Sequence, residues 1–304
     1  MTISPHHVDE VRNQGFAVVP EFVPRAQTSR LREAAAAHFP PAEEVRRDQA
    51  AVKGLANGQI FRLFPFDSDD LNDLALRPDV IGFAQAACGG RPVHLAQAVM
   101  RASYGGAGVP DQHLHRDYTD NTMLVPSDDP AFTHIPFLIY LTDVSLETSP
   151  THVCPRTATD DRPLWPRERP RDLDPELYEH ERPVVAEAGT AIVYSMSTFH
   201  RGSAFKAPTG VRFVLHVVYR PAGCEWMAST PFGGAFATEA GRRLMSRLDP
   251  SQRAVLGVPL PGHPFWTSET LAGMGERYPG IDLGPYLSVA VAHDGGRQVD
   301  AATG

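Results

Sequence analysis

The pattern of apolar and polar positions changes near residue 90. Before that point, helical sequence predominates: Ser4, followed by proline, is typical of a helix start, and Gly15 ends that helix. The apolar run that follows predicts a strand over 16–19, and alanine-rich sequence predicts helices over 25–39 and 71–87. The first part of the chain is therefore predicted to fold as helix, strand and further helices.

Beyond residue 90, short segments rich in β-branched and aromatic residues alternate with turns rich in glycine and proline. These segments predict strands over 94–104, 134–144, 183–187, 190–196 and 212–220. Because no long helix separates them, they favour an antiparallel sandwich or barrel over a parallel sheet with crossover helices. The predicted fold class is mainly β, with flanking helices.

The segment 156–182 interrupts the predicted strands. It is dense in proline and in charges of both signs, so it is too polar to form core and too long for a tight hairpin. A solvated loop and a lid over a site both fit this composition. After the last strand, Asp249 and Ser268 predict the starts of two short helices. No stretch has the composition of a linker, so one domain is predicted.

The composition excludes several classes of protein. Lys and Arg number 28 against 36 Asp and Glu, and a formal net charge of -8 provides no basic field for nucleic acid. The longest apolar stretch, 135–141, has about 7 residues where a membrane span needs about 20. The N-terminus has no export signal, and three widely spaced cysteines predict reduced thiols. We expect a cytoplasmic protein that acts on a small molecule, without nucleic-acid or membrane partners.

Side chains that can bind a metal are concentrated in the segment 112–117. In an extended segment, residues two apart point to the same face, so His115 and Asp117 can reach one ion. Such a pair also arises by chance in a chain with 13 histidines. The pair therefore gains meaning only from the residues that follow it in the chain.

Two downstream residues supply that context. His200 follows a predicted strand, and Arg212 begins the strongly β-forming run 212–220. An arginine that leads into a core strand is costly without an anionic partner, and a bound carboxylate would provide one. The order of these residues indicates a metal and a carboxylate ligand in one site.

In this order and spacing, His115-x-Asp117, His200 and Arg212 resemble the phytanoyl-CoA dioxygenase family of iron(II)- and 2-oxoglutarate-dependent oxygenases. The resemblance extends over about residues 8–221. Further matching segments are 15–20, 141–144 and 149–155. It implies a double-stranded β-helix, or jelly roll, as the core of the fold.

The family resemblance also implies how the chain is organised. A single oxygenase domain over 1–304 would have its β core at about 91–221 and a C-terminal helical extension at about 222–290. As a separate hypothesis, the loop 156–182 acts as a lid that closes the pocket together with the C-terminal helices and determines specificity.

Residue by residue, the resemblance implies that His115, Asp117 and His200 form the catalytic Fe(II) site. Arg212 would pair with the distal carboxylate of 2-oxoglutarate. From its place on the predicted strand before the His-x-Asp segment, Gln97 is a candidate second contact with that co-substrate, and an ordinary polar strand residue is the alternative. Three protein ligands leave three positions at an octahedral ion, two for 2-oxoglutarate and one for O2.

The implied reaction oxidises an unactivated C–H bond of a small organic or biosynthetic intermediate and releases succinate and CO2. Halogenating relatives carry a small residue in place of the carboxylate, so Asp117 favours hydroxylation or a related oxidation. The sequence does not identify the substrate or the oligomeric state.

Two alternatives remain open. His113, His115 and Asp117 also match the H-x-H-x-D opening of metallo-β-lactamase-like zinc hydrolases, which would require an αββα fold. A jelly roll that binds a ligand without catalysis is the other alternative. Of the remaining histidines, His216 is predicted to be a hydrogen-bonded core residue, and His152 to be structural.

Overall fold

The computed structural model describes residues 3–117, 122–124, 127, 129–163, 165–232 and 234–287. The chain forms two compact units, the first made of residues up to 64 and 73–230, the second of 65–72 and the residues from 231 onward. Among the described residues, no helix has the length and apolar character of a membrane span.

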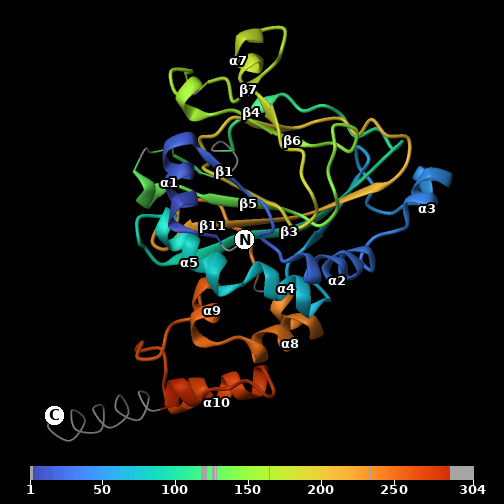
Figure 1. The fold of residues 1–304 in the computed structure, drawn as a ribbon. Coiled ribbons are helices and arrows are strands. Elements are labelled where there is room, and N and C mark those ends of the chain that lie inside the picture. Colours follow the sequence, from blue (N-terminus) through green and yellow to red (C-terminus); the bar gives the residue numbers. More distant parts are fainter. Residues whose placement is uncertain are drawn as a thin grey trace, which may run out of the picture. The chain divides into compact units, whose positions relative to one another are not determined.

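The first unit is built on two antiparallel sheets (Figure 1). The larger sheet has the order β1-β9-β5-β11-β3-β2, with β1 (Phe16–Val19), β2 (Gln59–Leu63), β3 (Val93–Tyr104), β5 (Ile135–Tyr140), β9 (Ala191–Tyr194) and β11 (Val211–Pro221). The smaller sheet has the order β7-β4-β10-β6-β8, with β4 (Leu114–His115), β6 (Thr151–Val153), β7 (Glu168–Arg169), β8 (Arg182–Pro183) and β10 (His200–Gly202). The predicted antiparallel two-sheet core is confirmed.

Helices cover the outer face of the larger sheet. They include α1 (Pro5–Gln14), α2 (Arg25–Ala36) and α5 (Pro78–Ala87). The short helix α3 (Ala42–Arg47) follows α2, and α4 (Asp69–Ala75) is divided between the two units. The short helix α7 (Pro175–Glu179) packs instead against β4 of the smaller sheet. On α5, Phe83 packs edge-on against Phe137 of β5, with ring centroids 5.7 Å apart. The prediction of one helix over 71–87 is wrong, because Pro78 begins a new helix rather than continuing the old one.

Alternate residues of each strand point to the face of the larger sheet that carries Val214 and Tyr140, which we call the inner face. Val214 of β11 lies opposite Tyr140 of β5 on one side and Arg101 of β3 on the other. Val214 and Tyr140 belong to a buried apolar cluster that also contains Ile192 and Tyr194 of β9. Since directly opposite residues share a face, Arg101 is also on this inner face.

The segment 156–182 is more ordered than its polarity predicts. It contains β7, α7 and the first residue of β8, and its residues Leu177 and Tyr178 are buried with Leu114 and Phe199. The Tyr178 hydroxyl accepts a hydrogen bond from the Leu114 backbone N–H at 3.0 Å. The prediction that this segment is too polar to form core is therefore wrong for Leu177 and Tyr178, which pack behind β4.

The second unit contains the C-terminal helices α8 (Glu239–Arg247), α9 (Pro250–Val255) and α10 (Ser268–Arg277). Asp249 caps α9 and Thr267 caps α10, which confirms the two predicted helices. The Trp266 and Tyr286 rings pack 4.5 Å apart between centroids and form a small core of their own.

Candidate metal centre

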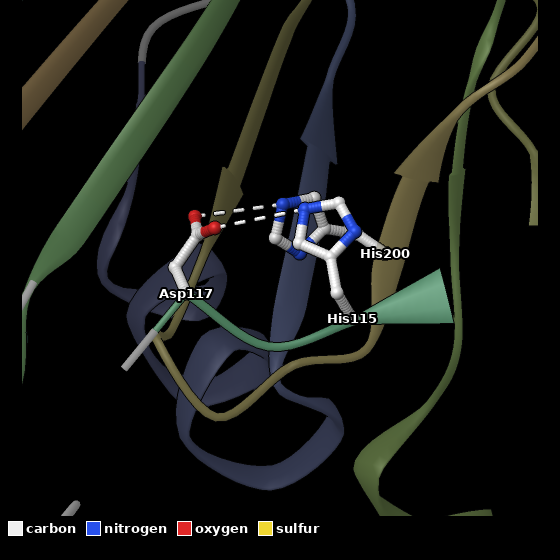
Figure 2. A group of neighbouring side chains, drawn as sticks. All are labelled: His115, Asp117 and His200. Carbon is white, nitrogen blue, oxygen red and sulfur yellow. Dashed lines mark ion pairs between the residues drawn. The ribbon is translucent and has the colours of Figure 1, made fainter. Parts of the chain in front are cut away.

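His115, Asp117 and His200 converge at one point of the first unit. One potential ligand atom from each lies within 4.8 Å of the others. The Nε2 atom of His115 is 3.8 Å from Oδ1 of Asp117, and Nε2 of His200 is 3.5 Å from Oδ2. Figure 2 shows both imidazole rings turned toward the carboxylate. The cross-strand pair His200–His115, between β10 and β4, brings together residues far apart in the sequence.

Backbone carbonyls fix the orientation of both imidazole rings. His115 Nδ1 donates to the carbonyl oxygen of His113 at 2.8 Å, and His200 Nδ1 donates to that of Thr198 at 3.0 Å. A carbonyl only accepts, so Nδ1 must carry the proton in each ring. In the neutral form each ring therefore presents an unprotonated Nε2 toward Asp117, which is the form that binds a metal.

Burial and neighbouring charges keep His115 neutral and Asp117 ionised, which are the forms that bind a metal. Burial, and then the electrostatic effect of the neighbouring His200, lower the pKa of His115 to about 4, so the His115 ring is neutral at pH 7. Burial alone would raise the pKa of Asp117, but His200, His115 and other neighbours lower it below its usual value. The ionised carboxylate of Asp117 and the Nε2 lone pairs therefore point at one another, and all of them are electron donors. A cation bound between them would interact favourably with each.

The turn between β9 and β10, which leads to His200, is held by the C-terminal end of α1. Thr198 Oγ1 donates to the carbonyl oxygen of Gly15 at 2.6 Å, and the Ser195 N–H donates to the same oxygen at 2.9 Å. Gly15 has φ of 85°, and a Cβ there would lie 2.6 Å from Thr198 Oγ1. Glycine is required at this position both for its conformation and for this close approach.

Arg116 anchors the His-x-Asp segment from its other side. Its guanidinium lies over the Phe199 ring, 4.1 Å from the centroid, and donates to the carbonyl oxygen of Thr159 at 3.0 Å. Because side chains alternate along an extended chain, a buried Arg116 directs His115 and Asp117 to the opposite face.

Tyr194 contacts two members of the group His115, Asp117 and His200, which we call the triad. Its hydroxyl donates to Asp117 Oδ2 at 3.3 Å, and its ring centroid is 4.6 Å from that of His200. Burial and the nearby negative charge of Asp117 raise its pKa well above the ordinary value, so the phenol keeps its proton. Tyr194 is a positioning residue for the carboxylate.

Arg212 lies on the inner face of the larger sheet, where it is 3% exposed. Its Nε and Nη1 atoms have no hydrogen-bond partner among the described residues. Burial lowers its pKa to about 10, with a smaller opposing effect of the Tyr140 hydroxyl. The group remains cationic at pH 7, and unpartnered buried N–H groups of this kind indicate a missing anion.

The structure places the other predicted residues separately from Arg212. Gln97 is partly buried on β3, opposite Val218, two strand positions beyond His216 on the inner face. His113 is exposed, and it contributes only its carbonyl to the site. His152 binds Glu181 at 3.1 Å, in keeping with a structural role.

His216 differs from its prediction as a hydrogen-bonded core residue. Its Nε2 has no hydrogen-bond partner among the described residues. Burial, and then the charge of Arg101, lower its pKa to about 4, while Asp117 opposes them. His216 therefore lies on the inner face near the triad as a neutral ring.

The donor set fits a divalent transition metal, and Fe(II) in particular. Two imidazoles and one carboxylate on one face, with open positions opposite, are the ligand set of non-haem Fe(II) oxygenases. Side-chain exposures of 15% for His115, 18% for Asp117 and 8% for His200 leave the site partly accessible. The zinc-hydrolase alternative loses support, because His113 lies outside the cluster and the two antiparallel sheets are not an αββα fold.

Fold and site together define a jelly-roll protein with a His-x-Asp…His metal site. The model of the phytanoyl-CoA dioxygenase (PhyH) family matches residues 11–212. Because this match takes in about two thirds of the chain and all four residues of the predicted motif, the chain belongs to that family. The predicted family resemblance is confirmed.

Solved structures support the fold. The non-heme alpha ketoglutarate dependent carbocyclase SnoK from nogalamycin biosynthesis is 19% identical, with a TM-score of 0.54 over 79% of this chain and 92% of that chain. EctD from S. alaskensis is 16% identical, with a TM-score of 0.54 over 76% and 82%. HygX from Streptomyces hygroscopicus, with nickel and 2-oxoglutarate bound, is 15% identical, with a TM-score of 0.52 over 73% and 89%. A search of curated proteins gave no match.

Three residues of the site were not predicted from the sequence: Tyr194, Arg116 and Arg101. A signal existed for Arg101, because alternation along β3 places it on the same face as Gln97. Like Arg212, a guanidinium in the apolar run 93–104 is costly without an anionic partner, so it indicates a bound anion. For Tyr194 and Arg116, the sequence contains no sign of the partner that each contacts.

Proposed function

We propose that the protein is a non-haem iron oxygenase that uses Fe(II), 2-oxoglutarate and O2 to oxidise a small organic molecule. His115, Asp117 and His200 hold the iron, and Arg212 binds the distal carboxylate of 2-oxoglutarate. Gln97 is a second candidate contact for that co-substrate. The reaction releases succinate and CO2 and places a hydroxyl group on an unactivated carbon of the substrate.

The observation that carries this proposal is the convergence of three metal-binding atoms within 4.8 Å of one another. On the inner face of the larger sheet, Arg212 provides buried N–H groups without a protein acceptor among the described residues. A dicarboxylate whose one end binds the metal and whose other end pairs with Arg212 satisfies both groups. Family membership and the 2-oxoglutarate in HygX add support.

The residues of this chain prepare the site for the metal and its co-substrate. Bound Fe(II) supplies the redox chemistry that couples O2 and 2-oxoglutarate to C–H oxidation. The carbonyls of His113 and Thr198 hold the protons on the Nδ1 atoms, so both Nε2 atoms are available as ligands without further reorganisation. Tyr194 holds Asp117, which remains ionised.

Neighbouring apolar side chains limit the access of water to the site. Tyr140, Ile192 and Val214 belong to one buried cluster on the inner face beside the triad. Such a lining favours reaction of the intended C–H bond over side reactions with water. Hydroxylation is proposed as the specific reaction because Asp117 is present. Structurally similar enzymes catalyse other reactions, and they include the carbocyclase SnoK and the epimerase SnoN.

The test is 2-oxoglutarate turnover, measured as succinate released in the presence of Fe(II) and O2. We expect wild-type protein to form succinate slowly without substrate and Asp117→Ala to form none, because one of three iron ligands is lost. Arg212→Ala should raise the 2-oxoglutarate concentration needed for half-maximal rate more than it weakens metal binding. Asp160→Ala, which removes an exposed carboxylate paired with Arg156, is the matched control and should behave as wild type.

Undiminished succinate formation by Asp117→Ala would contradict the assignment of the iron ligands. Absence of turnover in the wild type, together with tight zinc binding and hydrolytic activity, would instead favour the zinc-hydrolase alternative.

A further inference from the structure

A second arginine lies on the inner face beside Arg212. Arg101 of β3 is opposite Val214, and Arg212 is opposite Ser103, two positions along the same strand. Among the described residues, none accepts a hydrogen bond from Arg101, and its buried Nε has no partner. A guanidinium inside a fold without an acceptor is costly, so this position is suited to a ligand that brings one.

The positive charge of Arg101 is not balanced by the groups of the proposed site or by the proposed metal and co-substrate. Burial lowers its pKa, and the described groups that oppose this effect are Tyr194 and Asp117. Asp117 is committed to the metal in the proposed function. A divalent metal, Asp117, Arg212 and Arg101 together with doubly charged 2-oxoglutarate leave one positive charge in excess. One further anionic group in the site would balance it.

The surroundings of Arg101 also indicate what the rest of that ligand is like. Phe61 of the edge strand β2 is opposite Arg101, and its ring centroid is 5.0 Å from the guanidinium carbon. Leu63 follows on the same face of β2. These two apolar side chains are 43% and 60% exposed, beside a partly buried cation. Exposed apolar surface next to an unpartnered charge favours an amphipathic anion.

We propose that Arg101 is a substrate-binding residue that pairs with an anionic group of the substrate, a carboxylate or phosphate, while Phe61 and Leu63 contact the apolar part. This inference rests on the proposed function, because it assigns Arg212 to 2-oxoglutarate and Arg101 to the substrate. The substrate class is thereby narrowed to amphipathic organic anions.

The test uses the full chain loaded with Fe(II) and 2-oxoglutarate without O2, so that binding is measured without turnover. Calorimetry compares two acids with their neutral counterparts: 4-phenylbutanoate with 4-phenylbutanamide, and phenyl phosphate with phenol. We expect at least one acid to bind about tenfold more tightly than its neutral partner, as a charge-assisted hydrogen bond would give.

Variants separate the two arginines. Arg101→Gln should abolish the preference for the acid and Arg101→Lys should retain part of it, whereas Arg101→Gln should weaken 2-oxoglutarate binding far less than Arg212→Gln does. Arg62→Gln is the matched control. Arg62 directly follows Phe61 on β2, but its guanidinium lies over the Phe39 ring and not over that of Phe61. It should keep the wild-type preference.

Two results would overturn the inference while leaving the proposed function intact. The first is equal binding of acid and neutral partner in both pairs. The second is a loss of 2-oxoglutarate affinity in Arg101→Gln as large as in Arg212→Gln, which would place Arg101 in the co-substrate site. If the wild type fails to bind 2-oxoglutarate with Fe(II), the proposed function itself fails.

Discussion

The hydroxyl of Tyr194 donates a hydrogen bond to Oδ2 of Asp117 across 3.3 Å, and it does so from a fully buried strand position. This bond links the larger sheet, through β9, to the His-x-Asp segment. An oriented carboxylate binds a metal more tightly than a mobile one, since less order is lost on binding.

Replacing Tyr194 by Phe removes that bond and keeps the ring beside His200. We expect the affinity for Mn(II), used as an air-stable probe, to fall by about tenfold. Tyr219→Phe is the matched control, because Tyr219 is equally buried but donates to the Ala75 carbonyl on the other face of the sheet. An unchanged Mn(II) affinity in Tyr194→Phe would show that Asp117 is positioned by other contacts.

Glu181 joins β10 to its neighbours in the smaller sheet. Its carboxylate binds Arg201 and His152, at 2.6 and 3.1 Å, and also accepts from Arg171. Burial alone would raise the pKa of Glu181, but the hydrogen bonds from His152 and Arg201 lower it to about 2. Arg201 directly follows His200, so this network supports the strand that carries a metal ligand.

Glu181→Gln is therefore expected to cost about 3 kcal/mol in the free energy of unfolding at pH 7, measured with urea. A depressed carboxyl pKa stabilises the fold above the unfolded value of 4.5, so this contribution is lost as the pH falls from 4.5 toward 2. Glu43→Gln, at an exposed pair with Arg46, should cost at most about 1 kcal/mol. Equal costs for the two substitutions would contradict the account of Glu181.

His134 makes the fold sensitive to mild acid. It is 1% exposed and immediately precedes β5, and burial, followed by the charge of Arg220, lowers its pKa from 6.5 to about 4. The unfolded chain then binds a proton that the folded chain rejects, so stability falls as the pH drops from 6.5 toward 4.

Between pH 7 and pH 5, His134 alone should remove about 2 kcal/mol of unfolding free energy. Urea unfolding of the metal-free protein at both pH values, for wild type and His134→Asn, measures this contribution. The variant should show a smaller change between the two pH values, whatever its stability at pH 7. The same change in both proteins would rule out His134 as the source.

The fold class and the cluster of His115, Asp117 and His200 could be predicted from the sequence, for identifiable reasons. His115 and Asp117 are two apart in an extended segment, and Arg212 is the second residue of the long strand β11, whose β-forming pattern is strong. Strands β4, β6, β7, β8 and β10 have only two or three residues each, too few for a reliable alternation pattern. They pair with one another across long stretches of the chain, so their pairing could not be predicted from local sequence.

Within the site too, local patterns could be predicted from the sequence, whereas contacts between distant residues could not. Tyr194 is in a predicted strand, but its role depends on a contact with Asp117, which is 77 residues away along the chain. Leu177 and Tyr178 are in a polar segment and are buried only because β4 and Phe199 provide a surface for them. Partners so distant in sequence leave no local signal.

The central claim is that His115, Asp117, His200 and Arg212 together bind Fe(II) and 2-oxoglutarate. The most direct test is an anaerobic titration of the metal-free protein with Fe(II) and then 2-oxoglutarate, followed by its visible absorption spectrum. We predict a weak charge-transfer band of the chelated co-substrate in the wild type. The band should be absent in Asp117→Ala and should require more 2-oxoglutarate in Arg212→Ala. A wild-type spectrum that 2-oxoglutarate leaves unchanged would contradict the account.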